Sequence, residues 1–264
     1  MSTSIQFTGL WAIILGGSSG FGFASVEKLA QHGMNVAVLY RETSVAEKSI
    51  LKKFSAIAAV NQVSIRPYNV NALTLEGRES VIQKLSADGI GKGQVKLLLH
   101  SIARGNLKPL TGKDPLSAED IQFTTYAMSN SLLDWTRALM EAEFFHADAR
   151  ILGLTSEGAH KYWDGYAAVS LAKASLESLA KYMAVEFAPL GLKTNIIQAG
   201  ITPTSSLKMI PGSEKLIEIG NSRNPMGRIT QPEDVAKVVY LLCTDEAFWM
   251  NGALIHVDGG EHCR

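Results

Sequence analysis

Two side chains capable of acid–base chemistry, Tyr166 and Lys173, stand seven positions apart in one apolar, helical stretch of the sequence. Seven residues of α-helix turn through about 700°, almost two full turns, so both side chains can face the same side of one helix. A phenol can donate a hydrogen bond to an oxygen that gains negative charge, and a nearby ammonium group adds favourable charge. Such a pair also arises by chance, so its meaning depends on the elements that position it.

A glycine-rich turn follows the first apolar run of the chain and precedes a helical pattern. Glycines allow a sharp turn and let the backbone approach a pyrophosphate closely. The free N–H groups and the positive dipole end of the following helix favour an anion at the same place. We therefore predict a dinucleotide site made by Gly16, Ser18, Ser19, Gly20, Phe21 and Gly22.

The choice of dinucleotide depends on the end of the second predicted strand, which reads Tyr40-Arg41-Glu42. An acidic residue there would bind a free ribose 2′-hydroxyl, whereas an arginine would pair with a 2′-phosphate. Arg41 comes directly after the strand, which favours NADPH. Glu42 is one residue further on, so NADH stays open as the alternative.

The elements that carry these residues alternate between short apolar runs and longer helical patterns, as in a parallel sheet covered on both faces. We predict strands at Trp11–Gly16, Asn35–Tyr40, Val63–Asn69, Val95–His100, Arg150–Thr155, Thr194–Ala199 and Ala253–Val257. We predict helices at Gly22–His32, Ser44–Ile57, Ala72–Ala87, Ala118–Ala147, Tyr166–Ala188, Ser213–Gly220 and Pro232–Thr244. Strict alternation predicts an α/β Rossmann fold, a single domain over residues 1–264 with a doubly wound, parallel, seven-stranded sheet. Ligands of such sheets bind beyond the carboxyl ends of the strands.

Composition excludes several other classes of protein. Of 264 residues, 46% are hydrophobic and 19% are charged, which indicates a globular protein rather than a disordered one. The formal net charge of zero offers no basic surface for nucleic acid or an anionic membrane. The two cysteines match no metal-ligand spacing, so we predict no metal and no disulfide framework. Without a signal-peptide pattern or an apolar run of about 18 residues, we expect a cytoplasmic protein.

The spacing Gly-x3-Gly-x-Gly of the glycine turn resembles the short-chain dehydrogenase/reductase family, and the resemblance extends over essentially the whole chain. Most of that family has a lysine four residues after the catalytic tyrosine, but Val169 occupies the position four before Lys173. The longer Tyr166–Lys173 spacing looks like the enoyl-[acyl-carrier-protein] reductase branch. The segment His100-Ser101-Ile102-Ala103 points the same way, because ketoreductases typically have Asn-Asn-Ala-Gly there. Ketoreductases also keep a helix asparagine where this chain offers Met128 or Ser129, with Asn130 adjacent.

The resemblance implies a role for each matching residue. Tyr166 would stabilise the enolate that forms when hydride reaches the β-carbon of an unsaturated thioester, and Lys173 would hold the nicotinamide ribose. Enoyl reductases usually have a second tyrosine where this chain has Ser156, which therefore becomes a third candidate catalytic residue, with Tyr162 as another hydroxyl. Further cofactor contacts are expected from Asn69, Val70, Ser101, Ile102, Ala103, Ile201, Thr202 and Thr204.

The segment 205–225 follows the expected cofactor turn and mixes apolar with small residues, which favours a lid over an acyl chain. Within or near this lid we expect substrate contacts from Leu207, Met209, Arg104 and Tyr162, with His100 and Ala103 at the same mouth.

These residues predict an NADPH-dependent enoyl-thioester reductase whose substrate is carried on coenzyme A or on acyl-carrier protein, a possible protein partner. A carbonyl or hydroxyl oxidoreductase using Ser156, Tyr166 and Lys173 is the second hypothesis, and a non-catalytic dinucleotide sensor is the third. The apolar helices at 118–147 and 166–188 further predict a homo-oligomer, because one sheet cannot cover them completely. The resemblance, in which these helices pair across a two-fold axis, implies a homotetramer.

Overall fold

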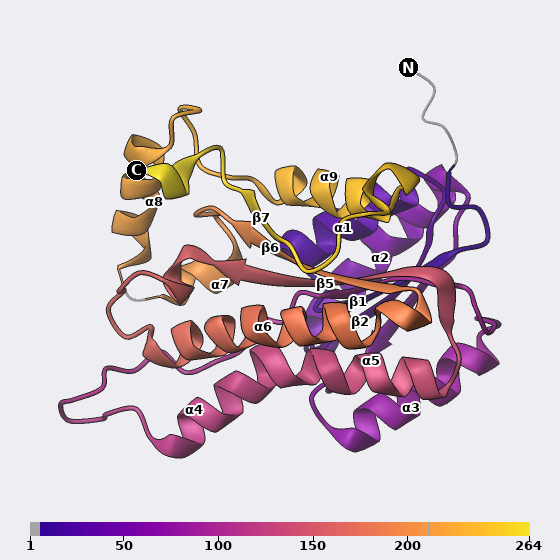
Figure 1. Ribbon diagram of the computed structural model, residues 1–264, viewed down its shortest axis with the longest axis horizontal. Helices are drawn as coiled ribbons and strands as arrows, with labels where there is room; N and C mark the ends of the chain where they lie inside the picture. Colours follow the sequence, from indigo (N-terminus) through magenta and orange to yellow (C-terminus); the bar gives the residue numbers. More distant parts are fainter. Residues whose placement is uncertain (1–5, 211) are drawn as a thin grey trace.

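A computed structural model describes residues 6–210 and 212–264 as one seven-stranded sheet covered by helices on both faces (Figure 1). The strand order is β3-β2-β1-β4-β5-β6-β7, and every neighbouring pair is parallel. This arrangement confirms the predicted doubly wound Rossmann architecture. The order reverses between β1 and β4, which is where the crevice for a ligand opens in such sheets.

The strands are short and largely buried, as their apolar sequences predict. They run over β1 (Trp11–Leu15), β2 (Asn35–Tyr40), β3 (Ile65–Asn69), β4 (Val95–His100), β5 (Phe145–Ser156), β6 (Leu192–Ala199) and β7 (Leu254–Val257). All residues of β1 and β4 are buried, because helices cover both of their faces.

Helices form one layer on each side of the sheet (Figure 1). One layer contains α1 (Gly20–Ala30), α2 (Ser44–Asn61) and α9 (Pro232–Cys243), whose apolar residues form one core cluster with the sheet. The other contains α3 (Leu75–Ala87), α4 (Ala118–Thr125), α5 (Ser131–Glu141) and α6 (Ala167–Glu186). Two further helices follow β6, namely α7 (Ser205–Lys208) and α8 (Ser213–Arg223), and α8 lies beside the C-terminus.

The predicted long helix at 118–147 is wrong in its extent. It is broken by a π-helical turn at Tyr126–Asn130, and α5 ends at Glu141. Glu143 then adopts a left-handed conformation (φ 57°), which ends the helix because side chains are poorly tolerated there. The chain continues into β5 at Phe145, so Phe144 and Phe145 do not belong to a helix surface.

Buried polar groups connect these layers to the sheet. The indole N–H of Trp135 on α5 donates to the Ala72 carbonyl at 2.8 Å, so this large ring is fully buried without an unpaired donor. On the other face, the buried Arg150 of β5 donates from Nε to the Leu242 carbonyl at 2.7 Å and pairs with Asp148. Such a buried guanidinium is tolerated because its donors are used. Within the described residues, no helix is both long enough and apolar enough to cross a bilayer.

Candidate active site

The glycine turn lies between β1 and α1 at the carboxyl edge of the sheet. Gly16 has a left-handed backbone (φ +86°), and a Cβ there would lie 2.5 Å from the Ser101 carbonyl oxygen. A Cβ on Gly22 would lie 2.2 Å from the Gly16 carbonyl oxygen, so Gly22 allows the helix to pack against the turn rather than lining the crevice. Ser19 is the N-cap of α1, but its side chain makes no capping bond. The hydroxyl of Ser19 and the first N–H groups of α1 are therefore available to an anion.

A cavity of about 240 Å³ opens beside this turn, and we call it the smaller cavity. Its walls come from the turn, from the ends of β2 and β4, and from the segment after β3. The predicted residues in these walls are Gly16, Ser18, Ser19, Gly20, Phe21, Arg41, Val70, Ser101, Ile102, Ala103, Arg104 and Thr204. At the glycine turn no Cβ blocks the approach of a ligand to the backbone, and the first N–H groups of α1 are unpaired. The smaller cavity therefore fits the pyrophosphate and adenosine parts of a dinucleotide.

The end of β2 is held by Asn69, at the end of β3. The Asn69 amide accepts from the Glu42 backbone N–H at 3.1 Å and donates to the Glu42 carbonyl at 3.0 Å. Asn69 does not line either cavity, so its observed role is to hold this loop. The Glu42 carboxylate accepts a hydrogen bond from the Ser18 hydroxyl at 2.9 Å, while the Arg41 side chain is exposed at the cavity wall.

A larger cavity of about 550 Å³ adjoins the first and contains the predicted catalytic hydroxyls. The Ser156 hydroxyl, at the end of β5, lies 3.3 Å from the phenolic oxygen of Tyr166. Tyr166 precedes α6 as its N-cap, so the helix starts one residue later than predicted. Burial raises the pKa of the Tyr166 phenol, and the hydrogen bond from Ser156 opposes that rise. Tyr166 is therefore a neutral hydrogen-bond donor rather than a phenolate.

Lys173 lies on α6 and also lines the larger cavity. It is only 7% exposed, and its ammonium group donates to the Leu154 carbonyl at 2.6 Å. Burial lowers the pKa of Lys173 to about 8, although the charge of Glu177 one turn later opposes this. Glu177 in turn accepts from the Thr155 hydroxyl at 2.6 Å, which fixes its carboxylate near the end of β5.

His100 does not line the cavity, contrary to the expectation that it would lie at the mouth. Its imidazole is buried, and Nε2 lies 2.8 Å from the Ser131 hydroxyl. Because Ser131 donates its own proton to the Ala127 carbonyl at 3.0 Å, Nε2 of His100 is the donor. Burial and the nearby charge of Lys173 lower the pKa of His100 to about 3, so this ring is neutral.

The π-helical turn decides between the three positions considered for a helix asparagine. Met128 is buried and lines the larger cavity, whereas Asn130 is exposed and does not. Ser129 is buried and donates to the Ser175 hydroxyl at 3.2 Å, so it ties the turn to α6. A thioether therefore occupies the position facing the cavity.

The predicted substrate residues divide into those on the cavity wall and one outside it. Arg104, Leu207 and Met209 all line the larger cavity. Tyr162 does not, and its side chain is 88% exposed. Sequence reasoning missed further apolar wall residues, among them Leu107, Trp163, Val169 and Leu216.

The turn after β6 also lines the larger cavity, with Ile201, Thr202 and Thr204. The Ile201 backbone N–H donates to the Glu261 carboxylate at 3.2 Å. The other oxygen of Glu261 accepts from Arg223 of α8 at 2.7 Å, and Arg223 also pairs with Glu157 after β5. These ion pairs join the predicted lid to the C-terminal segment, a link that sequence reasoning also missed.

Comparisons with known proteins agree with this geometry. A family model described as Enoyl-(Acyl carrier protein) reductase matches residues 16–262. A tropinone reductase homolog of Arabidopsis thaliana is 29% identical over 259 residues, covering 96% of this chain and 93% of that protein. The enoyl-[acyl-carrier-protein] reductase [NADPH] of Staphylococcus aureus is 29% identical over 247 residues, covering 93% of this chain and 92% of that protein. The crystal structure of an enoyl-[acyl-carrier-protein] reductase (NADH) from Aquifex aeolicus has a TM-score of 0.82 and 27% identity, covering 98% of each chain.

Proposed function

The chain belongs to the short-chain dehydrogenase/reductase family, in its enoyl-(acyl carrier protein) reductase group, and on that premise we propose that it reduces the 2,3 double bond of an enoyl thioester with NADPH. The observation that carries the proposal is the Tyr166 hydroxyl, 3.3 Å from Ser156 and in the same cavity as Lys173, with the long tyrosine–lysine spacing of that group.

Each residue of this site has a defined task. When bound, the nicotinamide would supply hydride to the β-carbon of the substrate, and a proton from solvent would then add to the α-carbon of the enolate. Tyr166 donates its hydrogen bond to the thioester oxygen as negative charge develops there, and the neutral state of the phenol suits that donation. Ser156 orients the phenol or adds a second donor to the same oxygen. Lys173 would hold the ribose hydroxyls of the cofactor and contribute positive charge to the same cavity.

The shape of the larger cavity supports an acyl substrate. Its walls include Leu107, Met128, Trp163, Val169 and Leu207, so an alkyl chain can replace water along them. Arg104 and Met209 are exposed residues of this wall, beside which the carrier would remain outside. Coenzyme A and acyl-carrier protein are both consistent with such an arrangement.

Arg41 supports NADPH as the cofactor, because an exposed guanidinium at the wall of the smaller cavity can pair with a 2′-phosphate. The two enoyl reductase relatives carry NADPH in one name and NADH in the other, so the choice depends on this chain's own residues. Glu42 is the competing feature, since its carboxylate can accept from a 2′-hydroxyl.

A carbonyl reductase is the second candidate, and Ser156 is the observation that favours it. A serine in this position can bind a substrate carbonyl beside the tyrosine, and tropinone reductase homologs are among the curated relatives. Matched assays with a trans-2-enoyl thioester and a β-ketoacyl thioester of equal chain length separate the two. We expect NADPH oxidation with the enoyl substrate, while turnover of the keto substrate alone would replace our proposal by the second. Absence of turnover with either, despite cofactor binding, would support a dinucleotide sensor.

A further inference from the structure

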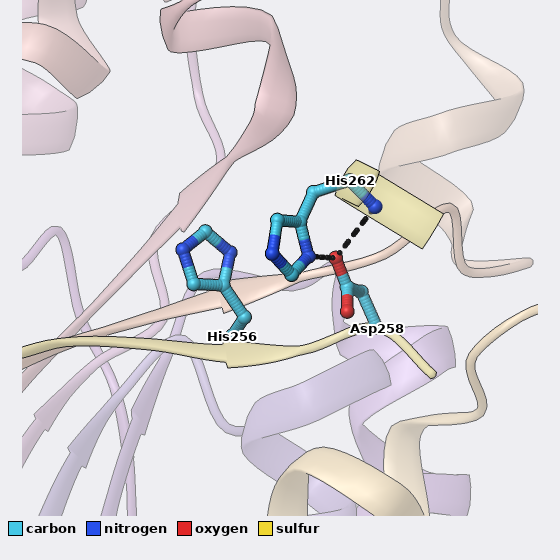
Figure 2. A group of neighbouring side chains, drawn as sticks. All are labelled: His256, Asp258 and His262. Atoms are coloured by element: carbon cyan, nitrogen blue, oxygen red, sulfur yellow. Dashed lines mark hydrogen bonds and ion pairs between the residues drawn. The ribbon is translucent and has the colours of Figure 1, made fainter. Parts of the chain in front are cut away.

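Four side chains that can bind metals lie together in the C-terminal segment, from β7 to the last turn at Glu261–Cys263. One ligand atom each from His256, Asp258 and His262 lies within 4.8 Å of the others. Figure 2 shows the two imidazoles beside each other, with the Asp258 carboxylate directed at His262. Cys263 follows directly, and its thiol lies 3.4 Å from Nε2 of His262.

Asp258 fixes the orientation and the tautomer of His262. The carboxylate is buried and accepts from Nδ1 of His262 at 2.6 Å, from the His262 backbone N–H at 3.1 Å and from the Gly260 N–H at 3.0 Å. Because a carboxylate that accepts three N–H bonds is ionised, Nδ1 of His262 carries the proton. Nε2 therefore carries no proton, and its lone pair is directed to the Cys263 thiol or to an ion. A carboxylate behind the far nitrogen of a histidine is the arrangement that commonly supports histidine ligands of metals.

The distance between Nε2 of His262 and Sγ of Cys263 fits two ligands of one tetrahedral ion. Zn–N bonds of about 2.0–2.1 Å and a Zn–S bond of about 2.3 Å place nitrogen and sulfur about 3.5 Å apart around a tetrahedral centre. Nε2 of His262 and Sγ of Cys263 are already 3.4 Å apart. The ring of His256 stacks on that of His262 at 3.8 Å between centroids, and the side chain is exposed. A rotation about its side-chain bonds can thus bring a nitrogen to the same ion.

We infer that His256, His262 and Cys263 bind a borderline-soft divalent cation such as Zn²⁺, with Asp258 as the outer hydrogen-bond partner of His262. Two nitrogens and one thiolate suit Zn²⁺ and leave a fourth position for water. The prediction of no metal considered only the spacing between cysteines, and this set instead combines histidines with Cys263.

The position of this site connects it to the cavity. Asp258, Glu261 and His262 line the larger cavity, so the ion lies at its rim. The same turn carries Glu261, which binds the Ile201 N–H and Arg223 of α8. An ion on His262 and Cys263 therefore stiffens the turn that holds the lid helix.

Titration of the full chain, free of any histidine tag, with Co²⁺ tests this inference without any activity assay. We expect one equivalent to give the visible bands of tetrahedral Co²⁺ together with a thiolate-to-cobalt charge-transfer band. Cys263→Ser should abolish the charge-transfer band, and His262→Gln should weaken affinity by at least about tenfold. His146→Gln, which removes an imidazole on β5, is the matched control and should leave the titration unchanged.

Thiol alkylation gives an independent measurement. Cys243 is fully buried, so Cys263 accounts for the reactive thiol of the native chain. We expect one equivalent of Zn²⁺ to slow alkylation of Cys263 at least about tenfold. In His262→Gln the same addition of Zn²⁺ should not slow the reaction. An unchanged alkylation rate, or a Co²⁺ spectrum that is the same in Cys263→Ser, would overturn the inference and leave Asp258 and His262 as a pair that only orders the turn.

Discussion

The hydroxyl of Ser156 and the phenol of Tyr166 are 3.3 Å apart although ten residues separate them in the chain. They meet because β5 ends at Ser156 and α6 begins directly after Tyr166, at the same edge of the sheet. Gly158 contributes to this approach, since a Cβ there would lie 2.5 Å from the Tyr166 ring. The relationship makes Ser156 a hydrogen-bond partner of the phenol that we propose to be catalytic.

Tyr166→Phe should lower kcat for the enoyl thioester by about 10²–10³-fold, the usual effect of removing one donor to a developing oxyanion. The dissociation constant for NADPH should stay nearly constant, because the phenol acts on the substrate oxygen. Steady-state kinetics and a fluorescence titration with NADPH check the two halves of this prediction. Tyr162→Phe is the matched control, since that exposed phenol is outside the cavity. Equal losses in both variants would contradict the assignment.

Activity should depend on the charge of Lys173. Its pKa is lowered by burial to about 8, so the charged form is present below that pH and is lost above it. We therefore expect kcat/KM to fall as the pH rises through about 8. Glu177→Gln should move this alkaline limb to lower pH, because Glu177 raises the pKa of Lys173 and the amide keeps the Thr155 hydrogen bond. Lys181→Gln, an exposed change on the same helix, should leave the limb in place.

Arg41 and Glu42 should act in opposite directions on cofactor choice. Arg41→Ala should raise KM for NADPH by about 10- to 100-fold, with little effect on NADH, since a charge-assisted contact contributes about 1.5–3 kcal/mol. Glu42→Gln should lower KM for NADPH, because it removes a carboxylate that would repel the 2′-phosphate. That carboxylate now accepts a hydrogen bond from the Ser18 hydroxyl. Equal effects of Arg41→Ala on both cofactors would show that Arg41 does not bind the 2′-phosphate.

Local sequence patterns predicted the strands, the glycine turn and the tyrosine–lysine pair, because each depends on nearby residues. The patterns predicted the wrong structure where contacts with segments distant in the sequence determine it. The apolar run through Phe144 and Phe145 continued the helical period, yet these residues pack at the start of β5 after the left-handed Glu143. Tyr162 was expected at the cavity beside Tyr166, but neighbours in sequence on a turn need not share a direction.

The C-terminal contribution to the site could not be predicted from local patterns either. Glu261 reaches the turn after β6 and Arg223 of α8 only because the chain returns over the sheet after β7. The lid contains three positive residues, Lys208, Lys215 and Arg223. The sequence alone does not show that Arg223 is the one that pairs with Glu157 and Glu261.

We propose that the protein is a homotetramer, because α6 exposes large apolar side chains that the monomer does not cover. Leu171 is 51% exposed, Tyr182 66% and Val185 74%. Burial of such side chains in an isologous interface would explain them. Leu171→Glu combined with Val185→Glu should lower the mass measured by light scattering, whereas Val60→Glu on exposed α2 should not. A wild-type monomer at micromolar concentration would contradict the proposal.

The segment 205–225 should exchange its amide hydrogens faster than the sheet and become protected when NADPH and a thioester analogue bind. Its helices α7 and α8 are short, and Gly212 between them has a left-handed backbone (φ +74°), so neither helix is stable without tertiary contacts. Pro211, which also interrupts the segment, lies outside the described residues. Leu207 and Met209 line the larger cavity, where an acyl chain would cover them.

Because of Arg223, the two helices of the lid should differ in their rates of amide hydrogen exchange. Its ion pairs with Glu157 and Glu261 hold the end of α8, whereas α7 has no comparable pair among the described residues. We therefore expect 205–210 to exchange faster than 213–223 in the free protein, and ligands to slow the first part more. Arg223→Gln should raise exchange in 213–223 towards that of 205–210, with Lys215→Gln, a change on the same helix outside these ion pairs, as the control. A lid must open independently of the sheet. If the amides of 205–225 are as protected as those of the sheet in the free protein, and ligands do not change this, the segment is a fixed part of the fold and not a lid.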